Sequence, residues 1–142
     1  APLTREEVEK ILKGDYAFLL YSPHSLCREF YIECTCNMMR PRTIVDYERI
    51  PWILDAGTVR ITFDSDVRAA IGSYDIFDPG LPALSVLEPG KLILEVKFTE
   101  MIPQLLRDVL PPPAAEFTAV SKYVLCYEKT RYMNGFEYWY ET

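Results

Sequence analysis

Histidine and cysteine are scarce in this 142-residue sequence, and their scarcity excludes several kinds of site. The four cysteines are Cys27, Cys34, Cys36 and Cys126. They lack the paired CxxC spacing of a structural zinc site, so we expect reduced and mostly buried thiols, as is usual in a cytoplasmic protein. The only histidine, His24, follows Ser22-Pro23 at an expected helix start, which favours a surface position over a role as a catalytic base.

Long apolar runs and an excess of basic charge are also absent. No run approaches the roughly 20 residues of a membrane-spanning helix, so we expect no membrane segment. The net charge of −6 argues against general nucleic-acid binding, which needs a basic surface. Hydrophobic residues make up 49% of the chain, enough for the core of a single domain over residues 1–142.

Capping and spacing signals predict four helices. They span about residues 5–13, 22–38, 103–110 and 119–131. Thr4-Arg5-Glu6-Glu7 has the form of a capping box, and Gly14 would end the first helix. In the second helix, four-residue spacing predicts a buried face formed by Leu26, Phe30, Cys34 and Met38. In the last helix, the spacing predicts a buried face formed by Val120, Val124 and Tyr127. The run Pro111-Pro112-Pro113 would stop the third helix, and the aromatic tail 136–140 is either a docked strand or an exposed end.

Alternating patterns predict an antiparallel sheet. The expected strands span residues 43–52, 59–64 and 91–99, with a turn at 55–57, and 65–90 is read as loop with a short strand near 84–87. On the second strand, one face would carry Val59, Ile61 and Phe63 into a core, and the other would carry Arg60, Thr62 and Asp64. Glu95 and Lys97 likewise share one face of the third strand. Periodicity alone leaves open whether these charged faces are simply solvated.

Four short motifs, in this order, resemble the vacuolar transporter chaperone (VTC) domain of polyphosphate polymerases. They are Tyr47-Glu48-Arg49, Val59-Arg60-Ile61-Thr62-Phe63-Asp64, Leu94-Glu95-Val96-Lys97 and Ser121-Lys122-Tyr123. The likeness runs from about Leu3 to about Tyr127. It implies an α+β fold in which an antiparallel β-sheet, packed by helices, forms part of a triphosphate-tunnel β-barrel lined with basic side chains that hold a phosphate chain.

The resemblance also implies roles for particular residues. Catalysis and substrate binding would fall to Arg49, Arg60, Lys97 and Lys122, with Arg68 and Ser121 as secondary substrate-binding candidates. Glu95 matches the position that binds the divalent metal, Mg²⁺ or Mn²⁺. Guanidinium groups suit bidentate phosphate contacts, and a carboxylate among them needs a cation to avoid repelling the phosphates. The alternative for each residue is a surface ion pair or a solvated polar group.

The activity implied is transfer of the γ-phosphoryl group of a nucleoside triphosphate to a polyphosphate chain. Inorganic triphosphatase activity and a non-catalytic phosphate- or polyphosphate-binding module are the alternatives. Nothing here matches the N-terminal strands of the family, so we interpret the chain as the C-terminal half of a VTC-like domain. Because three clear strands cannot close a tunnel, we expect it to pair with its N-terminal half or with another copy.

Overall fold

The computed structural model describes residues 1–55, 59–110 and 115–133. Its elements, in order, are α1 (Arg5–Leu12), the 3-10 helix η1 (Ala17–Tyr21), α2 (Ser25–Thr35), β1 (Val45–Leu54), β2 (Val59–Ala70), β3 (Ala83–Ser85), β4 (Ile93–Lys97), α3 (Gln104–Val109) and α4 (Lys122–Thr130). This arrangement confirms the α+β class and the antiparallel sheet. The four described strands form an open sheet, and no closed barrel is seen among them.

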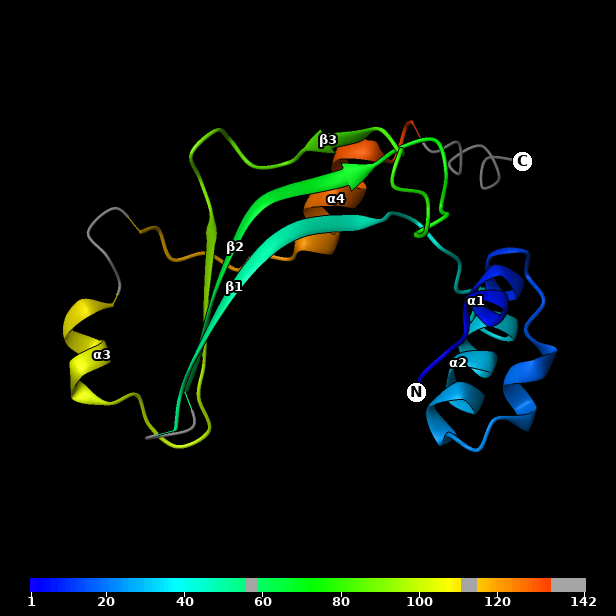
Figure 1. Ribbon diagram of the computed structural model, residues 1–142, viewed down its shortest axis with the longest axis horizontal. Helices are drawn as coiled ribbons and strands as arrows, with labels where there is room; N and C mark the ends of the chain where they lie inside the picture. Colours follow the sequence, from blue (N-terminus) through cyan, green and yellow to red (C-terminus); the bar gives the residue numbers. More distant parts are fainter. Residues whose placement is uncertain (56–58, 111–114, 134–142) are drawn as a thin grey trace.

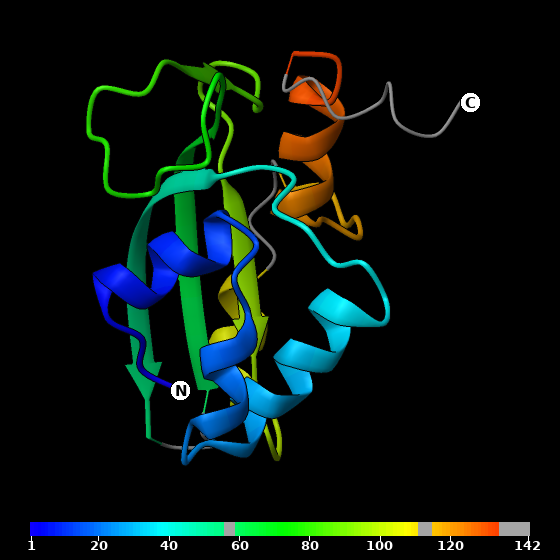
Figure 2. The same cartoon turned by 90° about the vertical axis from the view of Figure 1, so that its right-hand side faces the viewer.

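Strand β2 is the centre of the sheet. The long hairpin partner β1 pairs along one side of it, while β3 and β4 share the other side (Figure 1). β4 pairs with residues 60–64 and β3 with residues 68–70. The helices α1 and α2 lie at one end of the molecule's long axis and α3 at the other (Figure 1). Seen from the side, α1 and α2 stand in front of the sheet, and α4 lies beside its upper part (Figure 2).

A β-bulge in β2 lets the strand run past its predicted end at residue 64, to Ala70. The rest of 65–90 is mostly loop, as predicted, and β3 (Ala83–Ser85) lies near the short strand expected at 84–87. The register shifts between Asp46 and Glu48 of β1, and Asp66, on the opposing part of β2, has φ of 49°. This extra residue interrupts the alternation read from the sequence, but the strand continues beyond it to Ala70. After the bulge, Val67 and Ala69 point into a core that also contains Cys126 of α4.

The two faces of the sheet are buried unequally. We call the face that carries Arg49, Arg60, Thr62, Asp64, Glu95 and Lys97 the charged face. On β2, Asp64 and Thr62 are 0% and 3% exposed, whereas Ile61 and Phe63 on the opposite face are only partly buried. Of the three apolar residues of β2 that were expected in the core, Val59, Ile61 and Phe63, only Val59 is fully buried. The opposite face also exposes large apolar side chains of β1, namely Ile50, Trp52 and Leu54.

The predicted capping box and end of α1 are confirmed. Thr4 Oγ1 accepts a hydrogen bond from the Glu7 backbone at 3.3 Å, and Glu7 Oε2 accepts one from the Thr4 backbone at 2.7 Å. Gly14 follows with φ of 83°, a conformation that glycine adopts without steric cost. Local sequence signals were sufficient here because both partners lie within one turn.

The second predicted helix is shorter than expected, and only Cys34 and, in part, Phe30 of its predicted buried face belong to the core. It begins at Ser25 and ends at Thr35, and the preceding residues form η1, which was not predicted. Leu19 of η1 is fully buried against Cys27 and Cys34. Because η1 covers this side of α2, the cysteines enter the core, while two residues of the predicted face, Leu26 and Met38, are 58% exposed.

The two C-terminal helices are present as predicted, but the buried face of α4 is not. Val120 and Val124 are exposed, and the helix instead buries Cys126 and Thr130. Lys122 lies one turn before Cys126 on this same face, because residues four apart are neighbours on a helix. This face packs on the sheet and brings Lys122 to it. The turn after residue 55, the proline run 111–113 and the tail 136–140 lie outside the described residues.

The cysteines are free, and all but Cys36 are buried, as expected. Burial raises the pKa of the Cys34 and Cys126 thiols, which makes them poorer nucleophiles. His24 is an exposed residue at the N-cap of α2, consistent with the surface position predicted for it. None of the described helices combines the length and apolar character needed to cross a membrane.

Candidate functional site

Four cationic side chains reach the charged face from four different elements. Arg49 comes from β1, Arg60 from β2, Lys97 from β4 and Lys122 from α4. The register places Arg49 opposite Asp64 and Arg60 opposite Lys97, and Lys122 reaches Asp64 through an ion pair. The structure therefore brings together the four basic residues that the sequence motifs singled out.

A fully buried carboxylate, Asp64, holds two of these cations. Arg49 donates from Nε to Oδ1 at 2.6 Å and from Nη2 to Oδ2 at 2.8 Å, while Lys122 Nζ lies 2.6 Å from Oδ2. The Asp64 side chain is 0% exposed. These hydrogen bonds, first that from Arg49, outweigh the effect of burial and lower the pKa of Asp64 to about 2. The same bond raises the pKa of Arg49 above its ordinary value.

Glu95 extends the network toward β4. Lys97 Nζ lies 3.0 Å from its Oε1, and Arg49 Nη2 lies 3.8 Å from its Oε2. The hydrogen bond from Lys97 is the main cause that lowers the pKa of Glu95. Both carboxylates are thus ionised at neutral pH. Four cations and two anions share this face, which leaves an excess of two positive charges.

The Tyr47 ring supports the two cations that Asp64 binds. The guanidinium carbon of Arg49 lies 5.1 Å from the ring centroid, and Lys122 Nζ lies 5.4 Å from it. Both distances are within the range of cation–π attraction. Tyr47 and Asp64 therefore hold Arg49 and Lys122 side by side.

Arg60 lies beside a hollow at the hairpin end of the sheet. The hollow has a volume of about 540 Å³. It is lined by the basic residues Arg60 and Lys97, the acidic residue Asp55, and uncharged residues at the ends of β1 and β2 and just after β4. Across the described ranges, no carboxylate forms an ion pair with Arg60. Asp55 also lines the hollow, but it forms no ion pair with Arg60, so the guanidinium group is available to an anion from outside the chain.

A buried hydroxyl group completes the charged face. Thr62 lies between Arg60 and Asp64 on β2 and directly opposite Glu95 on β4. Its Oγ1 is buried and has no hydrogen-bond partner in the part of the chain that the structure describes. A buried hydroxyl without a partner is unusual, because leaving one unpaired costs about 1–3 kcal/mol.

Two secondary candidates are not part of this arrangement. Arg68 lies on the opposite face, where its Nη2 is 2.6 Å from Asp46 Oδ2 and its Nη1 is 3.4 Å from Asp66 Oδ2. The Ser121 hydroxyl caps α4, accepting a hydrogen bond from the Val124 backbone at 3.3 Å. Both side chains have structural partners that account for their positions.

Sequence reasoning missed Asp64, Thr62 and Tyr47 as parts of the site. Asp64 and Thr62 were placed on the same strand face as Arg60 by alternation, and this was the available signal. Tyr47 precedes Arg49 by two residues on β1, so the same argument puts the ring beside the guanidinium group. Nothing in the sequence indicated that Asp64 would be buried between a strand and a helix.

Glu95 is chemically suited to hold a divalent metal ion together with a phosphate ligand. Mg²⁺ is commonly held by one or two carboxylates plus substrate phosphates, not by a cage of protein ligands. Glu95 is partly exposed and offers one such carboxylate. No group of three or more His, Cys, Asp or Glu side chains suited to a metal occurs within residues 1–55, 59–110 and 115–133. Lys97 contacts Oε1, so a metal would bind to Oε2, or to both oxygens once Lys97 has moved away.

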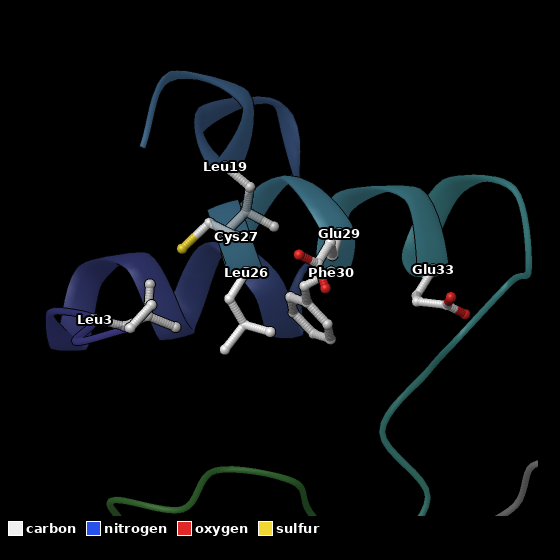
Figure 3. A pocket seen from close by; sticks show the side chains of 8 residues that line it. Leu3, Leu19, Leu26, Cys27, Glu29, Phe30 and Glu33 are labelled. Atoms are coloured by element: carbon white, nitrogen blue, oxygen red, sulfur yellow. The ribbon is translucent and has the colours of Figure 1, made fainter. Parts of the chain in front are cut away.

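A second pocket is chemically different from the charged face. It has a volume of about 400 Å³ and lies where the N-terminal segment meets η1 and α2, with Leu3, Leu19, Leu26 and Phe30 pointing into it (Figure 3). No basic side chain lines it, and its charged residues are Glu29 and Glu33. Two carboxylates would repel a phosphate chain, so this pocket is not the anion site.

A comparison with protein families agrees with the motifs. The model of the VTC domain family matches residues 1–131, nearly the whole chain. The chain therefore belongs to the VTC domain family. No curated protein and no solved structure matches it.

Proposed function

We propose that this chain supplies part of the site of a polyphosphate polymerase. The site would transfer the γ-phosphoryl group of a nucleoside triphosphate to the end of a polyphosphate chain. The observation that supports this most is the gathering of Arg49, Arg60, Lys97 and Lys122 on one sheet face with the carboxylate of Glu95. Membership of the VTC domain family is consistent with it.

The basic residues would bind and orient the phosphates. Arg60 and the Nη1 amino group of Arg49 have no hydrogen-bond partner among the described residues, and both present planar donor groups that match phosphate oxygens. Lys97 and Lys122 would add point charges along the same face. Such transfer needs positioning and charge stabilisation and no nucleophilic side chain, because the acceptor is itself a phosphate oxygen.

Glu95 would hold Mg²⁺ or Mn²⁺. When bound, the cation would neutralise charge on the phosphates and act as a Lewis acid toward the transferred group. Release of Glu95 by Lys97 would free the ammonium group to contact phosphate at the same time. The ion pair between Lys97 and Glu95 at 3.0 Å then represents the ligand-free arrangement.

A non-catalytic polyphosphate-binding role is the second candidate. The four described strands form an open sheet, so the charged face is not enclosed by them. An open face supports binding more than phosphoryl transfer, which benefits from exclusion of water. The same openness leads us to propose that strands from another copy, or from further polypeptide, pair with the outer edges of the sheet.

Edge pairing has a direct measurable consequence. We expect the chain to sediment as a dimer, or to associate with a co-expressed companion segment, at micromolar concentration. Analytical ultracentrifugation between 1 and 100 µM, on the order of typical dimer dissociation constants, would measure this. A monomer throughout that range, with no companion bound, would contradict the pairing proposal and leave the chemistry of the charged face unaffected.

Titration with tripolyphosphate tests the function itself. We expect binding to the full-length protein that weakens as salt is raised, because partly exposed charges are screened. Incubation with nucleoside triphosphate and Mn²⁺ should then yield polyphosphate. Release of orthophosphate alone would indicate a triphosphatase, and binding without turnover would indicate the non-catalytic module. A protein that does not bind tripolyphosphate at all would refute both candidates.

A further inference from the structure

We propose that Asp64 is a positioning residue that fixes Arg49 and Lys122 in the arrangement a phosphate chain requires. The proposal rests on the proposed function of the charged face. It concerns a carboxylate, which would ordinarily be expected to weaken the binding of an anion. Its basis is the geometry of one buried acid shared by two cations from different elements.

Asp64 uses only some of the hydrogen-bond donors of Arg49. A guanidinium group has five N–H donors, and Asp64 accepts from Nε and from Nη2. The Nη1 amino group has no partner among the described residues and points away from the side that Asp64 occupies. The carboxylate therefore binds the edge formed by Nε and Nη2 and leaves Nη1 for a ligand, while Glu95 Oε2 lies 3.8 Å from Nη2.

One carboxylate oxygen of Asp64 contacts both Arg49 and Lys122. Oδ2 of Asp64 accepts a hydrogen bond from Arg49 Nη2 at 2.8 Å and forms an ion pair with Lys122 Nζ at 2.6 Å. The two cationic groups are thereby held close together, although like charges repel one another. Tyr47 lies against both of them and limits their motion from a further side. Lys122 keeps two of its three ammonium protons for other partners.

Asp64 is more deeply buried than the two cations that it binds. Asp64 is 0% exposed, while the side chains of Arg49 and Lys122 are 34% and 18% exposed. A ligand from solvent can therefore reach the cations but not the carboxylate. Long cationic side chains lose conformational entropy when they bind a ligand, and preordering them reduces that loss. Asp64 orders both side chains before the phosphate arrives.

The substitution Asp64→Asn separates positioning from simple charge. By charge alone, removing an anion from this face should tighten the binding of tripolyphosphate. If Asp64 positions Arg49 and Lys122, binding of tripolyphosphate should weaken about tenfold or more, because the ligand must then order these two long side chains itself. The asparagine amide would also place N–H donors against Arg49 or Lys122, so it cannot replace both carboxylate oxygens.

Asp46→Asn is the matched control. Asp46 also binds an arginine at 2.6 Å, but it is exposed and lies on the opposite face. Both substitutions change the net charge by the same amount, so we expect tripolyphosphate affinity to change less than twofold in Asp46→Asn. Binding by Asp64→Asn that equals or exceeds that of the unmodified protein would overturn the proposal. Equal weakening by both substitutions would overturn it as well.

A measurement on the unmodified protein covers the case in which Asp64→Asn does not fold. The Nε–H proton of Arg49 should give a slowly exchanging NMR signal, assigned by its loss in Arg49→Lys. This signal should persist when tripolyphosphate is added, because the ligand takes the Nη1 edge. If the Nε–H resonance of Arg49 instead exchanged rapidly with water once tripolyphosphate was bound, the proposal would be overturned. Failure of the unmodified protein to bind tripolyphosphate would instead refute the proposed function, which is a separate result.

Discussion

Glu95→Gln should lower the rate of Mn²⁺-dependent polyphosphate synthesis by about 10²–10³-fold in the full-length protein while leaving polyphosphate binding intact. Glutamine keeps the shape of the side chain but removes the charge that would hold the metal. In the absence of metal, binding should stay the same or become tighter, since a carboxylate that repels phosphate is lost and Lys97 is released. The split between rate and binding is expected because the metal mainly serves the transition state.

Glu48→Gln provides the control for this substitution. Glu48 is exposed on β1 and points to the opposite face of the sheet, opposite Ser65. Glu48→Gln should leave both the rate of polyphosphate synthesis and polyphosphate binding unchanged. Synthesis and chain binding would be measured side by side in each variant. Unimpaired synthesis by Glu95→Gln would show that Glu95 is only a partner of Lys97 on the strand, and the metal role would have to be abandoned.

The parts of the fold that depend on local sequence were predictable. The capping box at Thr4 and Glu7 involves partners three residues apart, and the strand containing Glu95 and Lys97 follows from simple alternation. The bulge at Asp66 was not predictable in the same way. A non-glycine residue at positive φ leaves no reliable mark in a single sequence, so the strand was ended too early.

The basic residues of the candidate site could be predicted, but the contacts that organise them could not. Alternation placed Arg60 and Lys97 on the polar faces of their strands, and the family motifs singled out Arg49, Arg60 and Lys97 as phosphate-binding candidates. The position of Lys122 depends on which side of α4 packs on the sheet, and apolar spacing indicated the wrong side. The helix buries Cys126 and Thr130 on the same face from which Lys122 forms its ion pair with Asp64. That contact is tertiary, and no local pattern reports it.

Arg60→Met tests the other end of the charged face and should weaken tripolyphosphate binding and synthesis together. A charge-assisted hydrogen bond contributes about 1.5–3 kcal/mol, so we expect tripolyphosphate affinity to fall by about 10–100-fold. Because Arg60 has no ion-pair partner among the described residues, its removal breaks no internal bond and should change the free energy of unfolding by less than about 0.5 kcal/mol. The loss would therefore report contact with the ligand.

The same change at an exposed arginine outside the sheet supplies the comparison. Arg107 lies on α3, and Arg107→Met removes an equal charge from a residue that is in none of the strands. Binding titrations at two salt concentrations would separate a specific contact from the general effect of net charge, since only the latter should be shared by both variants. If the two substitutions weaken binding equally, Arg60 contributes only to the overall charge of the chain. If Arg60→Met alone weakens it, the hollow beside Arg60 and Lys97 is where the phosphate chain binds.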